Sequence, residues 1–350
     1  MIMGCDWHPR YQIVAWVEEE TGEIMTRRLE HENGEARRFY ESLPRGAIVG
    51  MEATLPSHWF ERLLGECGHH LWVGDSAKIR ASEVRRQKTD GRDAEHILDL
   101  LLAGRFPRIW VPSMAERDLR QLLVHRMKMV RTRTAVKNQL HFLAMSQGVC
   151  RKRKLWSRRG RAELEGLRLL PWASRRREEL LRWHDQLDRS VEELDRAVEE
   201  AGRGRAEVAL LRTHPGVGPV TGLAFVLTVG PIDRFPNSRK LVSYLGLNPS
   251  EHSSGGRQRL GTISKQGNRM LRWLLVEAAQ TTARLDPELH RTYQRLKFRR
   301  PSGVAKVAIA RRLAVRLYWM LRAQIDYAQL VRTSGSPSSA VVPNQSGSRV

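Results

Sequence analysis

The chain has 350 residues, and its 60 Lys and Arg residues outnumber its 38 Asp and Glu residues to give a formal net charge of +22. So large a positive charge favours a polyphosphate partner through release of counterions, and 41% hydrophobic residues exclude a disordered basic tail in favour of two or three globular domains. Three widely spaced cysteines, Cys5, Cys67 and Cys150, suggest neither a disulfide framework nor a zinc site, and they predict a protein of the reducing cytoplasm.

The first hundred residues alternate between predicted strands and helices. An apolar run predicts a buried strand at residues 2–5, and a turn between 11–17 and 23–29 predicts an antiparallel hairpin. Further apolar runs predict a strand at 47–51, a helix at about 57–67 and a short strand at 71–73. Asp6 follows the first of these strands, and Glu52 closes the strand at 47–51. Ligand sites gather at strand ends in such sheets, so both carboxylates are candidate site residues.

A predicted helix supplies two more carboxylates, Asp90 and Asp93. They are three residues apart and share a helix face, while an apolar stripe from Ile97 to Leu102 packs the helix onto the sheet. Each acid alone is an ordinary turn former or helix-start residue. Together, the four acids match two-metal phosphoryl transfer, in which carboxylates hold Mg²⁺, or Mn²⁺ in its place.

Two short motifs carry a resemblance to a known family. Glu52-Ala53-Thr54 and the Lys-Thr-Asp-x-x-Asp-Ala pattern at 88–94 resemble the transposases of the IS110 family over about residues 1–330, although Leu55 stands where relatives commonly carry Gly. The resemblance implies a RuvC-like domain with a DEDD quartet, here Asp6, Glu52, Asp90 and Asp93. It also implies excision and insertion of the protein's own mobile element, a guide RNA encoded by that element, and a homo-oligomer.

The middle of the chain reads as long basic helices. A capping box at 113–116 starts the first, whose basic residues favour phosphate contact: Arg117, Arg120, Arg126, Lys128, Arg131, Arg133 and Lys137. A basic cluster at 151–161 with Trp156 interleaved suits RNA, although a lone Trp is more often core. Heptads at 180–194 and 184–198 predict a coiled coil, within the chain or between subunits. His184 lies on its seam and is expected to pack there or to give polar specificity rather than to bind a metal.

The last third reads as a small helical domain. Residues 210–222 predict helix, glycine hairpin and helix, which suits contact with a DNA backbone but also a plain helical corner. A polar loop follows at 245–256, then a helix from about Arg269 to Arg284 and a basic amphipathic helix over 297–317. In the resemblance this loop supplies a nucleophilic serine, aligned with Ser254, and Ser253 is its competitor.

These patterns predict an α/β plus all-α protein: a RuvC-like domain at 1–112, a basic coiled-coil region at 113–205, a transposase domain at 206–332 and a disordered tail at 333–350. No signal peptide or membrane-spanning segment is expected. The leading hypothesis is a DNA transposase that cleaves and rejoins strands through a covalent phosphoserine. One alternative is a Holliday-junction endonuclease that uses metal-activated water, and another is a nucleic-acid scaffold without catalysis.

Overall fold

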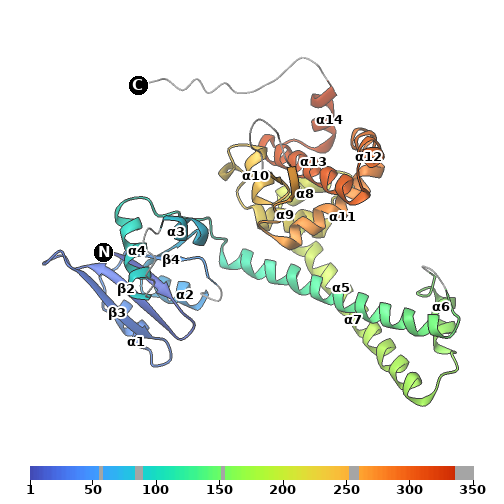
Figure 1. Ribbon diagram of the computed structural model, residues 1–350, viewed down its shortest axis with the longest axis horizontal. Helices are drawn as coiled ribbons and strands as arrows, with labels where there is room; N and C mark the ends of the chain where they lie inside the picture. Colours follow the sequence, from blue (N-terminus) through green and yellow to red (C-terminus); the bar gives the residue numbers. More distant parts are fainter. Residues whose placement is uncertain (55–57, 83–89, 151–153, 252–259, 336–350) are drawn as a thin grey trace. The chain divides into compact units, whose positions relative to one another are not determined.

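The computed structural model describes residues 1–54, 58–82, 90–150, 154–251 and 260–335, and the chain forms two compact units, Met1–Val111 and Pro112–Val350 (Figure 1). The first unit is built on a five-stranded sheet in the order β3-β2-β1-β4-β5. Its strands are β1 (Ile2–Trp7), β2 (Tyr11–Val17), β3 (Ile24–Glu30), β4 (Ile48–Glu52) and β5 (His70–Gly74). β1 to β3 form an antiparallel meander, and β4 and β5 run parallel to β1.

Helices cover both faces of this sheet. They are α1 (Glu35–Glu41), α2 (His58–Glu66), α3 (Ser76–Ser82) and α4 (Asp90–Leu102). Phe39 of α1 and Phe60 of α2 pack against Met3 and Cys5 of β1, whereas α4 lies on the opposite face, where Leu98 packs against Ala15. This arrangement confirms the predicted mixed-sheet domain.

Gly4 lets α4 approach β1 closely. A Cβ at Gly4 would lie 2.1 Å from the carbonyl oxygen of Ala94, so only glycine fits at this crossing. Because side chains alternate along a strand, Asp6 shares the α4 face with Gly4. The crossing therefore brings the start of α4 to the strand that carries Asp6.

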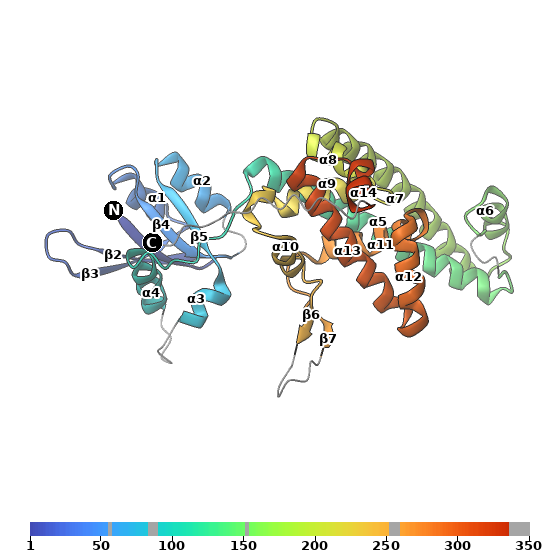
Figure 2. The same ribbon diagram turned by 90° about the horizontal axis from the view of Figure 1, so that it is seen from above.

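The second unit contains an antiparallel pair of long helices, α5 (Met114–Ser146) and α7 (Pro171–Arg203), which we call the helical arm (Figures 1 and 2). The predicted capping box starts α5, because Ser113 accepts from the Glu116 amide and the Glu116 carboxylate accepts in return. α6 (Arg158–Glu165) joins the two helices near one end of the arm. Val136 and Leu140 of α5 pack with Leu180 of α7, so the predicted heptads contribute to a seam within the chain.

The rest of the second unit is a helical bundle. Its elements are α8 (Ala206–Arg212), α9 (Pro219–Val229), η1 (Ile232–Arg234), α10 (Ser238–Tyr244), β6 (Pro249–Glu251), β7 (Leu260–Ile263), α11 (Arg269–Leu285), α12 (Pro287–Arg299), α13 (Ser302–Ala323) and α14 (Tyr327–Gly335). Leu223, Leu275 and Leu313, from α9, α11 and α13, meet in its core. α8 and α9 with the turn between them form the predicted helix-hairpin-helix.

Three predictions about this bundle were wrong in detail. The polar loop expected over 245–256 includes strand β6, which pairs with β7 through Pro249 and Ile263. The single basic helix expected over 297–317 is two helices, because Pro301 lies between α12 and α13 and cannot continue a helix. Residues 333–335, expected in a disordered tail, belong to α14, which extends to Gly335, and the rest of that predicted tail, residues 336–350, lies outside the described residues. Among the described residues, no helix is long and apolar enough to cross a membrane.

Candidate active site

The site is built at the carboxyl end of β1, beside the equivalent end of β4. Cys5 pairs with Met51 in the parallel register, so Asp6 and Glu52 are level on neighbouring strands. Asp6 is the penultimate residue of β1 rather than the residue after the strand, as the sequence had suggested. Asp90 and Asp93 lie in the first turn of α4, which packs against β1.

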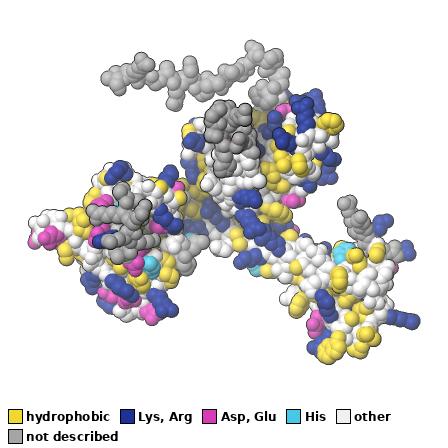
Figure 3. All heavy atoms as spheres, viewed as in Figure 1, with side chains coloured by type: hydrophobic (Ala, Val, Ile, Leu, Met, Phe, Trp, Pro, Cys, Tyr) yellow, Lys and Arg dark blue, Asp and Glu magenta, His cyan; other side chains and the backbone are white. Residues whose placement is uncertain are grey.

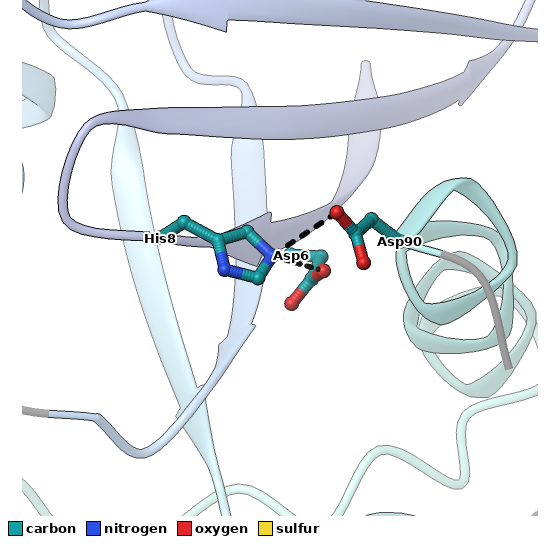
Figure 4. Close-up of side chains that lie close together, drawn as sticks. All are labelled: Asp6, His8 and Asp90. Carbon is teal, nitrogen blue, oxygen red and sulfur yellow. Dashed lines mark hydrogen bonds and ion pairs between the residues drawn. The ribbon is translucent and has the colours of Figure 1, made fainter.

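Asp6, His8 and Asp90 converge on one point (Figure 4). The Nε2 atom of His8 lies 2.9 Å from Oδ2 of Asp6 and 3.7 Å from Oδ2 of Asp90. One ligand atom from each residue lies within 4.8 Å of the other two, an arrangement that can hold a metal ion. The three side chains are partly exposed, so an ion reaches them from solvent.

Asp93 acts on this group electrostatically. Burial raises the pKa of the Asp6 carboxyl, and the negative charges of Asp93 and Asp90 raise it further, against the opposing hydrogen bond and charge of His8. Carboxylates that repel one another in this way are stabilised by a cation between them. The donor set of carboxylate oxygens with one imidazole nitrogen therefore fits a divalent metal.

Tyr11 orients this group from the start of β2. Its hydroxyl donates to Oδ2 of Asp90 at 2.8 Å, and its ring stacks on His8 with centroids 4.7 Å apart. On β3, the other strand of the hairpin, the guanidinium of Arg28 lies 3.7 Å from the centre of the Tyr11 ring. The hydrogen bond to Asp90 is the main cause that raises the pKa of the Tyr11 hydroxyl.

The sequence analysis missed both His8 and Tyr11. The signal for His8 was its spacing: residues two apart in extended chain point the same way, so His8 follows Asp6 to the same face. Tyr11 gave no comparable signal, because its contact with Asp90 spans 79 positions along the sequence.

Glu52 is held differently from the three aspartates. Its Oε1 accepts from a guanidinium nitrogen of Arg80, on α3, at 2.9 Å, and this hydrogen bond raises the pKa of Arg80. Within the described residues, the group that meets metal-ligand distances consists of Asp6, His8 and Asp90 and includes neither Asp93 nor Glu52. The structure thus brings Asp6 and Asp90 together, places Asp93 close enough to act electrostatically on Asp6, and leaves Glu52 paired with an arginine.

Two family models match parts of this chain. Residues 3–144 match a family model for IS110-type DEDD transposases, and residues 208–294 match a model described as "Transposase IS116/IS110/IS902 family". A probable family 20 transposase of Pseudomonas aeruginosa is 30% identical over 301 residues, which cover 82% of this chain and 87% of that relative. The chain belongs to the IS110 family of transposases.

Two further relatives are transposases of named insertion sequences. The transposase for IS1111A of Coxiella burnetii is 27% identical, and the match covers 69% of this chain and 67% of that relative. The transposase for IS1328 of Yersinia enterocolitica is 28% identical, with 84% of it and 79% of this chain covered. As an IS110-family transposase the protein acts on DNA, and its DEDD-type domain indicates dependence on a divalent metal.

The serine candidates of this transposase, Ser253 and Ser254, lie outside the described residues, as do Leu55 and the Lys88-Thr89 part of the motif. The strands on either side of the serines are β6 and β7, which pair through Glu251 and Leu260.

Several basic residues predicted to contact phosphate have structural partners instead. On α5, Arg126 and Arg133 form ion pairs with Asp195 and Asp188 of α7, and Arg120 donates to the carbonyl of Leu227. Arg126 and Arg133 therefore join α5 to α7, and Arg120 joins α5 to α9. Lys128 and Arg131 are exposed on the same helix and remain candidates for phosphate contact.

Trp156 is a packing residue. Its ring stacks on His184, with centroids 4.5 Å apart at an interplanar angle of 12°, and its Nε1 donates to His141 at 3.2 Å. His184 is itself buried, in agreement with its predicted packing role. The glycine hairpin is also partly engaged, because a Cβ at Gly216 would lie 2.5 Å from the Thr282 hydroxyl of α11. Gly218, at the N-cap of α9, is exposed and remains available to a phosphate.

Proposed function

We propose that this transposase excises and inserts its own insertion-sequence element by metal-dependent cleavage and rejoining of DNA through a covalent phosphoserine. The observation that carries the proposal is the convergence of Asp6 and Asp90, with Asp93 nearby, at the meeting of β1 and α4. The proposed nucleophile is Ser254, in the segment between β6 and β7, and Ser253 is the competitor.

Asp6, Glu52, Asp90 and Asp93 would hold Mg²⁺, for which Mn²⁺ can substitute. Bound there, the divalent cation supplies charge stabilisation at the phosphate. Glu52 would join this set by exchanging its ion pair with Arg80 for the metal, a change open to it because its side chain is 35% exposed and that of Arg80 is 69% exposed.

In the proposed reaction the serine hydroxyl oxygen forms a bond to a DNA phosphorus while the bond from that phosphorus to one deoxyribose oxygen breaks. The serine proton is lost, and the released deoxyribose oxygen takes up a proton. Attack by the hydroxyl of another strand reverses these steps and frees the serine. One ester replaces another at each stage, so strand joining needs no separate energy source.

The partners we propose are DNA at the element ends and the target, a guide RNA encoded by the element, and further copies of the protein. The net charge of +22 supports binding to nucleic acid. Hydrophobic side chains are visible on the helical arm in Figure 3. Exposed apolar side chains on the arm and at the N-cap of α7 support self-association: Phe142 is 69% exposed, Leu170 81% and Trp172 79%. The proposed setting is the cytoplasm, which agrees with the three free cysteines.

The test is to incubate the full-length protein with Mg²⁺, candidate element RNA and labelled donor and target DNA, and to look for protein-linked DNA. The variants are Ser254→Ala and the matched control Ser253→Ala. We expect an adduct in the wild type and in Ser253→Ala and none in Ser254→Ala. Metal-dependent nicks without an adduct would support the hydrolytic junction endonuclease instead. Activity unchanged by Asp6→Ala would contradict the carboxylate site.

A further inference from the structure

His8 directs its imidazole into the carboxylates of the candidate metal site. Its Nε2 atom faces the two aspartates and lies 2.9 Å from Oδ2 of Asp6 and 3.7 Å from Oδ2 of Asp90 (Figure 4). Ligand atoms about 2.1 Å from a shared cation lie about 3 Å apart when they occupy adjacent octahedral positions. The 2.9 Å separation is close to this value, and the 3.7 Å separation lies between it and the about 4.2 Å expected for ligands on opposite sides of the cation, so both can be met by ligands that share one ion.

The surroundings of His8 fix its ring in this orientation. Tyr11 stacks on the imidazole at an interplanar angle of 24°, and the same tyrosine donates its hydroxyl to Asp90. One residue thus orients two of the three side chains, as outer hydrogen-bonding partners do in metal sites. The imidazole is still 34% exposed at its side chain, so an entering ion can reach it.

An imidazole nitrogen alters which cation the site favours. Mg²⁺ takes almost exclusively hard oxygen ligands, whereas Mn²⁺, which also favours oxygen, is the first member of the first-row series whose affinity for mixed nitrogen and oxygen sites rises towards Cu²⁺. We propose that Nε2 of His8 is a ligand of the cation held by Asp6 and Asp90, and that it makes this position selective for Mn²⁺ over Mg²⁺. The proposal rests on the metal site of the proposed function and adds to it a nitrogen ligand outside the four acids.

The competing explanation is that His8 only donates a hydrogen bond to Asp6. Both explanations allow His8→Ala to lower activity, so activity does not separate them. The nuclear spin of nitrogen does, because a directly bound ¹⁴N modulates the electron spin echo of Mn²⁺. The experiment therefore measures Mn²⁺ bound to the full-length protein by pulsed electron paramagnetic resonance, with dissociation constants for Mn²⁺ and Mg²⁺ measured in parallel.

Three variants define the expected result. His8→Ala should abolish the ¹⁴N modulation and weaken Mn²⁺ binding by on the order of tenfold, with a smaller effect on Mg²⁺. His8→Asp, which replaces nitrogen with oxygen, should retain a bound ion without ¹⁴N modulation and shift the preference towards Mg²⁺. His70→Ala is the matched control, because His70 is exposed at the opposite end of the parallel strands and should leave every signal unchanged.

Two results would overturn the inference, and they are distinguishable. Mn²⁺ bound without ¹⁴N modulation in the wild type, or with modulation that persists in His8→Ala, would remove His8 from the ligand set and leave the proposed function intact. A wild-type protein that binds neither Mn²⁺ nor Mg²⁺, with or without DNA, would remove the metal site itself and the proposed function with it.

Discussion

Gly4 sets the distance between the strand and the helix that carry the acids, so Gly4→Ala should damage the site without touching a carboxylate. The new Cβ would lie 2.1 Å from the carbonyl oxygen of Ala94 and 2.5 Å from the amide nitrogen of Leu98. Both atoms belong to the backbone of α4, so rotation of a side chain cannot relieve the contact. Carbon and oxygen atoms in close contact are normally about 3.3 Å apart, so α4 must move by about 1 Å.

This displacement should affect stability and metal binding together. Overpacking of a tight interface costs about 1–3 kcal/mol of unfolding free energy. Asp90 and Asp93 would move with α4 while Asp6 stays with the sheet, and a binding constellation tolerates only about 0.5 Å of displacement. We therefore expect Mn²⁺ affinity to fall by on the order of tenfold, measured by titration, along with a lower melting temperature.

The control is Gly91→Ala, a substitution of the same type in the first turn of α4. A Cβ at Gly91 meets no described atom within 4 Å, so this variant should bind Mn²⁺ normally and gain up to about 1 kcal/mol from better helix propensity. Wild-type Mn²⁺ affinity in Gly4→Ala would refute the claim that this crossing sets the spacing of the acids.

Two predictions concern the second unit. Burial lowers the pKa of His214 to about 4, below the value of about 6.5 in the unfolded chain, so the unfolded state binds the proton more readily. The free energy of unfolding should therefore fall by up to about 3 kcal/mol as the pH drops from about 6.5 to 4. Urea unfolding should show that His214→Phe loses this dependence on pH, and an unchanged dependence would exclude His214 as its source. Arg316→Ala should cost about 3–5 kcal/mol, because it leaves the carboxylate of Asp286, only 1% exposed, without its charge partner. Arg312 is 4.0 Å from a carboxylate oxygen of Glu288, at the surface, so Arg312→Ala should cost less than about 1 kcal/mol in thermal unfolding. Equal losses of stability in the Arg316 and Arg312 variants would contradict the burial argument.

Elements with a strong local pattern could be predicted from the sequence. The strands of the first unit, the capping box at Ser113 and the helix at Arg269–Leu285 all depend on residues close together in the chain, and all were confirmed. Strand β6 was missed because its pairing partner, β7, begins nine residues beyond its end, and three polar-looking residues carry no strand period of their own.

The candidate site was predictable only in part, for the same reason. Asp6, Asp90 and Asp93 could be grouped because their positions relative to a strand and a helix are local features. The partners that define their chemistry are not local: Tyr11 on β2 reaches Asp90, 79 positions later in the chain, and Arg80 on α3 reaches Glu52, 28 positions earlier. Sequence order alone does not reveal which acid a given cation neutralises.

The same reasoning bears on where this transposase contacts nucleic acid. A net charge of +22 suggests many phosphate contacts, but a charge that is paired within the fold contributes little to counterion release. Arg126 and Arg133 are about one-fifth to one-quarter exposed and bind acids of α7, whereas Lys128 and Arg131 are exposed. The arm should therefore meet phosphate through Lys128 and Arg131, and substitutions at Arg126 or Arg133 should act first on the packing of α5 against α7. Charge counted along a helix overstates its binding surface unless the acids of the neighbouring helix are counted as well.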